Sequence, residues 1–125
     1  MALSERQALT LWQRTLVASV RSDGPDLTAR QQAILMTVSL TRGPHTVRGL
    51  ALALNIAKPA VTRALDTLTK DTLVKRVRDE SDLRNVFIER TSEGVAYLRE
   101  LAGYILAAEQ GPAEPAGRDD KTAAA

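Results

Sequence analysis

The sequence contains no cysteine, and this absence removes several classes of site at once. Disulfides, thiolate metal centres, iron–sulfur clusters, cysteine nucleophiles and thiol-based redox switches are all excluded. Histidine occurs once, at His45 beside Gly43-Pro44, where a role in a turn or at a phosphate fits better than acid–base catalysis. No phosphate-cradling glycine-rich motif and no nucleophile elbow is present. We therefore expect no enzymatic activity, no metal and no cofactor.

Long apolar runs are missing as well. No uninterrupted stretch approaches the roughly 20 residues that a membrane helix requires, and Ser4, Glu5 and Arg6 lie close to the N-terminus. We expect a soluble, cytoplasmic protein that makes no membrane contact.

The net charge is small, but it is unevenly distributed. Lysine and arginine number 17 against 15 acidic residues, a formal charge of +2. Between Arg42 and Arg90 there are ten basic and six acidic residues, a surplus of four. A basic segment between near-neutral flanks indicates a module that faces a polyanion, although an ordinary solvated face explains the charge alone equally well.

Capping patterns and turn residues predict the outer helices. Ser4 with Gln7 and Thr28 with Gln31 are capping-box patterns, which predict helices over about 4–21 and from Thr28 to about Leu40. A last helix begins near 92 and runs to about 108. We expect the outer helices, 4–21 and 92–108, to complete their burial in a homodimer, because they carry broad apolar stripes in a small domain. The residues expected to form the dimer contact are Leu9, Trp12, Leu16, Val20, Leu98, Leu101 and Ile105.

The middle of the chain predicts a helix-turn-helix followed by a hairpin. A short helix over 46–54 ends at Asn55, which tolerates the left-handed backbone of a tight turn, and Pro59 suits the first turn of the next helix, which runs to about Lys70. Two short β-branched runs, 73–77 and 86–88, flank a polar tip. The fold class is therefore mainly α with a small β-hairpin wing, a winged helix-turn-helix. We expect one domain over 1–108, with its winged part at 42–90 and a disordered tail at 109–125.

The second helix of the pair has the residue types of a DNA recognition helix. With Val61, Leu65 and Leu68 inward, donors fall on the outward side, where they can meet the base edges of a major groove. Arg63 can form a two-pronged contact to guanine or contact a phosphate, and Lys58 can meet a phosphate at the helix N-terminus. The residues expected to contact DNA from this helix are Lys58, Pro59, Ala60, Thr62 and Arg63.

The hairpin supplies a second basic surface. An arginine at its tip can enter a minor groove or neutralise the backbone across it. Asp82 can orient Arg84 through a bidentate pair, which either presents the guanidinium to DNA or only stabilises the hairpin. The carboxylates around the tip give weak evidence for a metal, and a solvated loop explains them better. The wing residues expected at DNA are Arg76, Arg78, Asp82 and Arg84.

These motifs resemble the bacterial MarR family of transcriptional regulators. The resemblance rests on Arg48-Gly-Leu-Ala-Leu-Ala-Leu-Asn-Ile-Ala-Lys-Pro-Ala-Val-Thr-Arg-Ala-Leu65, Leu73-Val74, Asp79-Glu-Ser-Asp-Leu-Arg84 and Thr91-Ser-Glu-Gly94. It implies a homodimer that pairs through its terminal helices, binds pseudo-palindromic double-stranded DNA and often represses promoters. It also places the family's Asp-x-Arg wing motif on Asp82 and Arg84. Arg90 stands where the family usually has an apolar residue, so we expect the closing strand to pack differently.

The sequence leaves three functions open. The first, which we favour, is a sequence-specific regulator that reads the major groove with 58–70 and contacts backbone or minor groove with 75–88. The second is a winged helix that binds an acidic protein partner, and the third is an architectural protein without an operator. Some family members release DNA on binding a small aromatic ligand, but four aromatic residues give little support to such a pocket, so an effector stays unknown.

Overall fold

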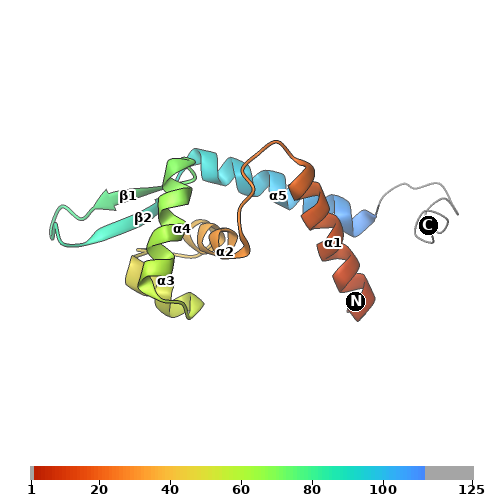
Figure 1. The fold of residues 1–125 in the computed structure, drawn as a ribbon, viewed down its shortest axis with the longest axis horizontal. Coiled ribbons are helices and arrows are strands. Elements are labelled where there is room, and N and C mark those ends of the chain that lie inside the picture. The colour runs from red at the N-terminus through yellow and green to blue at the C-terminus, as the bar shows by residue number, and fades with distance from the viewer. Residues whose placement is uncertain (1, 112–125) are drawn as a thin grey trace, which may run out of the picture. The chain divides into compact units, whose positions relative to one another are not determined.

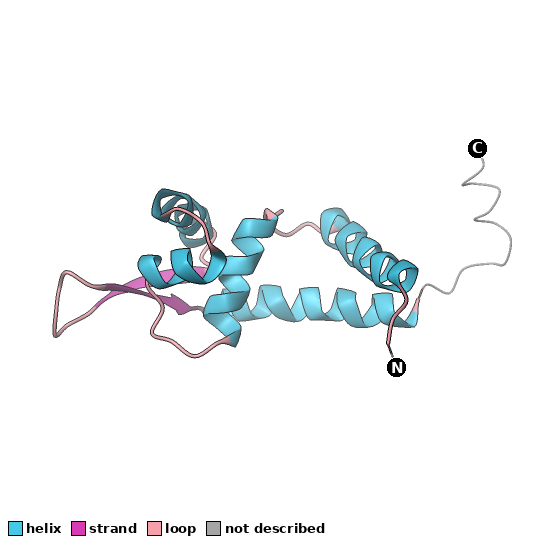
Figure 2. Cartoon of the chain, turned by 90° about the horizontal axis from the view of Figure 1, so that it is seen from below, coloured by secondary structure: helices cyan, strands magenta, loops and turns pink. Residues whose placement is uncertain are grey.

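Five helices and a two-stranded antiparallel sheet make up residues 2–111, which a computed structural model describes (Figure 1). In chain order the elements are α1 (Glu5–Arg21), α2 (Ala29–Leu40), α3 (Val47–Leu54), α4 (Lys58–Lys70), β1 (Val74–Arg78), β2 (Val86–Arg90) and α5 (Ser92–Gln110). Figure 2 shows that the two strands of the hairpin are the β-structure of the described residues, which otherwise form helices and loops. The predicted fold class, mainly α with a β-hairpin wing, is confirmed.

Local sequence signals account for the helix boundaries. Ser4 and Gln7 form a reciprocal capping box, in which the Gln7 amide donates to Ser4 Oγ at 3.1 Å and the Ser4 amide donates to Gln7 Oε1 at 2.8 Å. Thr28 and Gln31 do the same for α2, at 3.1 and 2.9 Å. Asn55 ends α3 in the left-handed conformation, with φ 55°. The capping patterns and the turn residue were thus correctly interpreted.

The described chain divides into two compact units, which we call the central unit, Asp23–Glu100, and the terminal unit, residues up to Ser22 together with those from Leu101 onward. The central unit holds the core in which α2, α3, α4 and the hairpin meet. Its buried apolar residues are Leu27, Ile34, Leu35, Val38, Leu50, Ala51, Val61, Ala64, Leu65, Leu68, Leu73, Val74 and Ile88. Val61, Leu65 and Leu68 therefore lie inward, as the helical period of α4 predicts.

The two strands pair in a register that gives the hairpin an inner and an outer face. Val74 lies opposite Arg90, and Arg76 lies opposite Ile88. Because paired residues share a face, these four side chains lie on the core side of the sheet, where Val74 and Ile88 are buried. Arg90 donates from Nη1 to the Ser39 carbonyl of α2 at 3.3 Å. The basic residue in an apolar place is thus accommodated by turning its guanidinium to the end of a neighbouring helix.

Two further features tie the hairpin to the helices. The Ile88 amide donates to the His45 carbonyl at 2.8 Å, so the loop before α3 joins the edge of β2, and His45 Nε2 lies 3.0 Å from the Thr41 carbonyl. Thr91 Oγ1 accepts from the Gly94 amide at 2.9 Å and donates to the Thr72 carbonyl at 2.7 Å. The Thr-x-x-Gly motif therefore caps α5 and fastens it to the start of the hairpin.

The terminal unit contains α1 and the later part of α5. Arg14 Nη1 donates to the Ala108 carbonyl, one of the last carbonyls of α5, at 3.2 Å. The helix continues to Gln110, so the prediction of a disordered tail from 109 is wrong for Glu109 and Gln110. Residues 112–125 lie outside the described residues. In residues 2–111 no helix is long and apolar enough to cross a membrane.

Candidate nucleic-acid interface

Helix α4 divides cleanly into a core side and a solvent side. Its start at Ala57 has no side-chain cap, and Pro59 occupies the first turn. The open end of the helix therefore keeps its partial positive charge for an anion. Helical spacing brings six residues onto the exposed side: Lys58, Pro59, Thr62, Arg63, Asp66 and Lys70. Four of the five residues expected to face DNA, Lys58, Pro59, Thr62 and Arg63, lie on this side.

Ala60, the fifth of them, lies on the core side. Only 8% of its surface is exposed, and it shares the buried side of α4 with Val61 and Ala64. The expectation that it approaches bases is therefore not met, because residue 60 follows the inward stripe of 61, 64, 65 and 68.

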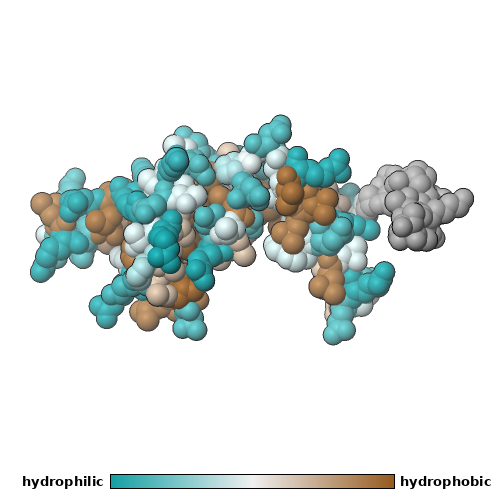
Figure 3. Space-filling view, viewed as in Figure 1, coloured by the Kyte–Doolittle hydropathy of each residue, from teal (hydrophilic) through white to brown (hydrophobic). Residues whose placement is uncertain are grey.

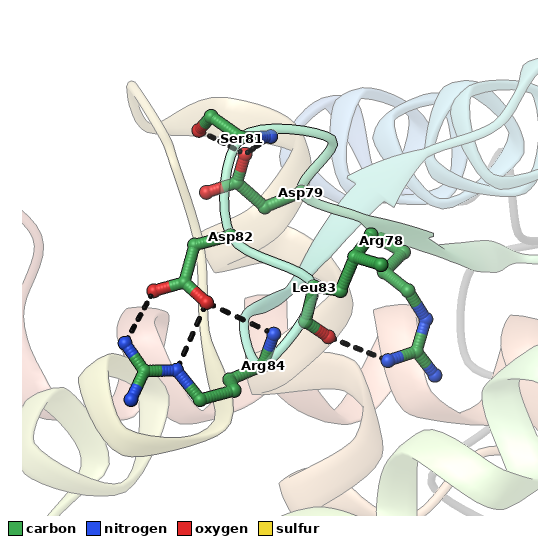
Figure 4. Close-up of polar contacts among 6 residues, drawn as sticks. All are labelled: Arg78, Asp79, Ser81, Asp82, Leu83 and Arg84. Carbon is green, nitrogen blue, oxygen red and sulfur yellow. Dashed lines mark hydrogen bonds and ion pairs between the residues drawn. The ribbon is translucent and has the colours of Figure 1, made fainter.

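Asp82 and Arg84 form the clamp that their spacing predicts. Arg84 donates from Nε to Asp82 Oδ1 and from Nη2 to Oδ2, both at 3.0 Å, and its backbone amide also donates to Oδ1 at 3.1 Å (Figure 4). These bonds lower the pKa of Asp82 from its ordinary value, and they raise that of Arg84. The Arg84 side chain is 89% exposed, so the clamp fixes its direction and still leaves most of the guanidinium open to solvent.

Further hydrogen bonds join residues within the loop between β1 and β2. Asp79 Oδ1 accepts from the amide and the hydroxyl of Ser81, at 2.9 and 2.7 Å, and these bonds lower the Asp79 pKa. Arg78 Nη1 donates to the Leu83 carbonyl at 2.6 Å, across the loop (Figure 4). Arg78, which we expected to contact DNA, therefore also shapes the wing.

Arg76 has a structural partner that the sequence analysis did not identify. Its Nη2 lies 2.8 Å from Asp66 Oδ1, which joins β1 to the exposed side of α4. Asp66 falls between Arg63 and Lys70 on the outward side of α4, and Arg76 lies on the inner face of the hairpin, so their pairing depends on how β1 packs against α4. This exposed ion pair links the wing to the outward side of α4, so Arg76 has a structural partner as well as being a candidate DNA contact.

The residues expected to form a dimer contact fall into two groups. Leu98 packs in part against the core of the central unit, and Leu101 is buried in the terminal unit. The others are exposed: Leu9, Trp12, Leu16, Val20 and Ile105. Thr15 is the buried residue of α1, so nearly the whole apolar stripe of this helix faces solvent. Figure 3 shows this as brown surface over α1.

Comparison with known proteins places this architecture in a family. The model of the MarR family matches residues 27–86. The transcriptional regulator AdcR of Streptococcus pyogenes is 40% identical over 65 residues, which make up 52% of this chain and 43% of that protein. The crystal structure of AdcR, described as the adhesin competence repressor, is 30% identical with a TM-score of 0.55 over 80% of this chain and 71% of that one. The chain belongs to the MarR family.

A further MarR-type structure resembles the chain over nearly its whole length. A MepR mutant from S. aureus, bound to an oligodeoxyribonucleotide, has a TM-score of 0.72 and 20% identity, and the match covers 94% of this chain and 85% of that one. At this identity the likeness concerns the fold. The family predicted from the helix-turn-helix, wing and Thr-x-x-Gly motifs is thus confirmed, while the sequence match to AdcR spans less than half of that relative.

Proposed function

We propose that the protein is a sequence-specific repressor of transcription that binds double-stranded DNA as a homodimer. The observation that carries this proposal is the exposed side of α4, where Lys58, Thr62 and Arg63 stand beside an uncapped helix N-terminus. An exposed helix side that is rich in hydrogen-bond donors fits a major groove, and the clamped Arg84 fits the backbone or the minor groove next to it. The MepR mutant, which shares this fold, is bound to an oligodeoxyribonucleotide, and this supports DNA as the ligand.

The homodimer follows from the apolar side of α1. Leu9 is 70% exposed and Val20 is 66% exposed, with Trp12 and Leu16 between them on the same stripe. Leaving such a stripe in water forgoes the free energy that burial gives, and a second copy of the same stripe is its simplest cover. To bind a pseudo-palindromic site, such a dimer would have to hold its two α4 helices about 34 Å apart, one turn of DNA.

Dimerisation is tested by light scattering of the Trp12→Asp variant. A charge in the middle of the stripe is expected to give a monomer, whereas Leu40→Asp, a change at an exposed leucine of α2, is expected to leave the dimer intact. Equal masses for Trp12→Asp and the unmodified protein would exclude α1 as the contact.

DNA recognition is tested by selecting bound fragments from random duplex and measuring their affinity. Arg63→Ala is expected to cost about 1–3 kcal/mol at the selected site and to relax specificity, because it removes a bidentate base contact. Arg84→Ala is expected to weaken all sequences more evenly and to reduce the slope of log K against log salt by about 1. Arg30→Ala, an exposed arginine of α2, is the matched control and should bind as the unmodified protein does.

The outcomes separate the three functions that the sequence leaves open. Steep salt dependence with a preferred site supports the regulator, and steep salt dependence with no preference supports an architectural protein. Failure to bind any duplex would favour an acidic protein partner. None of these functions requires catalysis or a cofactor, and a DNA-binding role implies action in the cytoplasm.

A further inference from the structure

The loop at the end of the wing, residues 79–85, is fixed before it meets any partner. The Asp79 amide donates to the Asn85 carbonyl at 3.0 Å, and the Asn85 amide donates to the Asp82 carbonyl at 2.9 Å. The Asp82–Arg84 clamp and the bond from Arg78 to the Leu83 carbonyl complete the set. A loop held by so many internal bonds loses little conformational entropy on binding, so its shape is a preformed contact surface.

Leu83 is the exposed apolar residue of this loop. Its carbonyl accepts from Arg78, while its side chain is apolar and the residue is 61% exposed. It is the one large exposed hydrophobic residue on the described hairpin, and it stands between the two members of the Asp82–Arg84 clamp. Figure 3 shows brown surface at the outer end of the wing. An exposed leucine on a rigid loop that carries Arg84 contributes little to the fold.

We propose that Leu83 is a specificity-determining residue that enters the minor groove beside Arg84 and packs against the edge of a base step. This inference rests on the DNA-binding function proposed above. Proteins that bind the minor groove often combine a basic side chain with an apolar wedge that partly unstacks a step and bends the duplex. Pyrimidine–purine steps unstack most easily, so the wing prefers sites with a TA or CA step where its tip lands.

The electrostatics of the tip separate the role of Leu83 from that of Arg84. The guanidinium acts through charge, so its contribution to affinity falls as salt rises. An apolar contact releases no counterions, so its contribution is insensitive to salt. Loss of the Leu83 side chain should therefore lower the affinity for DNA by the same factor at every salt concentration. A change in the placement of Arg84 would instead alter the slope of log K against log salt.

The test uses the full chain and a duplex recovered by selection, labelled at both ends to report bending by energy transfer. Leu83→Ala is expected to bind about tenfold more weakly, from the apolar area it gives up, with an unchanged salt slope and a smaller bend. Replacing the flexible step under the wing by a stiff A-tract step should weaken the unmodified protein and leave Leu83→Ala unaffected. Leu40→Ala, which truncates a leucine that is 74% exposed on α2, is the matched control.

Each outcome decides the matter. Equal affinity and equal bend for Leu83→Ala and Leu40→Ala would overturn this inference while DNA binding by the unmodified protein stands. A salt slope that falls in Leu83→Ala would also overturn it, because the side chain would then act through Arg84. If the unmodified protein selects no duplex, the proposed function itself fails. The thermal midpoint of Leu83→Ala should match that of the unmodified protein, since the side chain is exposed.

Discussion

Replacing Thr72 by glycine should stabilise the protein. Thr72 follows the C-cap of α4 with φ 61°, a left-handed conformation that is rare for a β-branched residue. The backbone around it is well bonded, since the Thr72 amide donates to the Thr69 carbonyl at 3.0 Å and the Leu73 amide donates to the Leu68 carbonyl at 2.9 Å. Leu68 and Leu73 are both buried. This is a Schellman motif that holds threonine where glycine is the usual residue.

The size of the effect follows from two opposing contributions. A left-handed backbone costs a residue with a Cβ atom about 1–2 kcal/mol, which glycine avoids. Glycine gives back about 0.5–1 kcal/mol through the greater freedom of the unfolded chain. The bond from Thr72 Oγ1 to the Asp71 carbonyl, 2.6 Å long, is exposed and adds little. We expect a net gain of about 1 kcal/mol, which corresponds to a rise of about 4 °C in the thermal midpoint for a chain of 125 residues.

Thermal and urea unfolding, followed by circular dichroism at one fixed protein concentration, measure the gain. Thr72→Ala removes the hydroxyl but keeps the Cβ atom, so it should not stabilise. Asn55→Gly is the control for glycine itself, because Asn55 has a similar φ of 55° and asparagine tolerates it. A loss of stability in Thr72→Gly, or an equal gain in Asn55→Gly, would refute the strain argument.

Three further changes test the parts that hold the wing in place. Gly94→Ala would drive a Cβ atom into the Leu73 carbonyl, so we expect a loss of about 3 kcal/mol or more in urea unfolding, at the upper end of overpacking. Asp66→Ala breaks an exposed ion pair and should cost less than about 1 kcal/mol of stability. It should also strengthen non-specific DNA binding and steepen its salt slope by about 1, since an acid leaves the face that we propose meets phosphate. For Asp82, the lowered pKa means that the charged carboxylate and its clamp persist above the ordinary value of 3.8 and are lost only as pH falls below it. A carboxyl titration by NMR should show that low pKa, and Arg84→Ala should return it toward 3.8, while an unchanged titration would contradict the clamp.

The helices were predictable because their ends carry strong local signals. Each helix boundary is set by residues close to it in the chain, as the capping boxes, Asn55 and Pro59 show. Such short-range effects can be recognised in a single sequence. The Asp82–Arg84 clamp was predictable for the same reason, as its partners are two residues apart. Local signals of this kind need no knowledge of how distant segments pack.

The features that the sequence analysis missed depend on tertiary contacts. Arg76 reaches Asp66 because β1 packs against α4, and Ala60 lies on the buried side of that helix. Leu98 carries the same apolar signal as a dimer contact, yet it packs in part on the core of its own chain. Apolar character alone does not say which partner covers it. The family, by contrast, followed from motif spacing.

The connection between α4 and β1 is too short to absorb an added residue. Only Asp71, Thr72 and Leu73 separate the last residue of the helix from the first residue of the strand, and both ends of this link are anchored in the core. An added residue here would shift the strand by one place and exchange its two faces, so that Lys75 would take the position of Arg76. Variation in the length of the wing among relatives should therefore accumulate in residues 79–85, where extra chain extends outward and leaves the strand register intact.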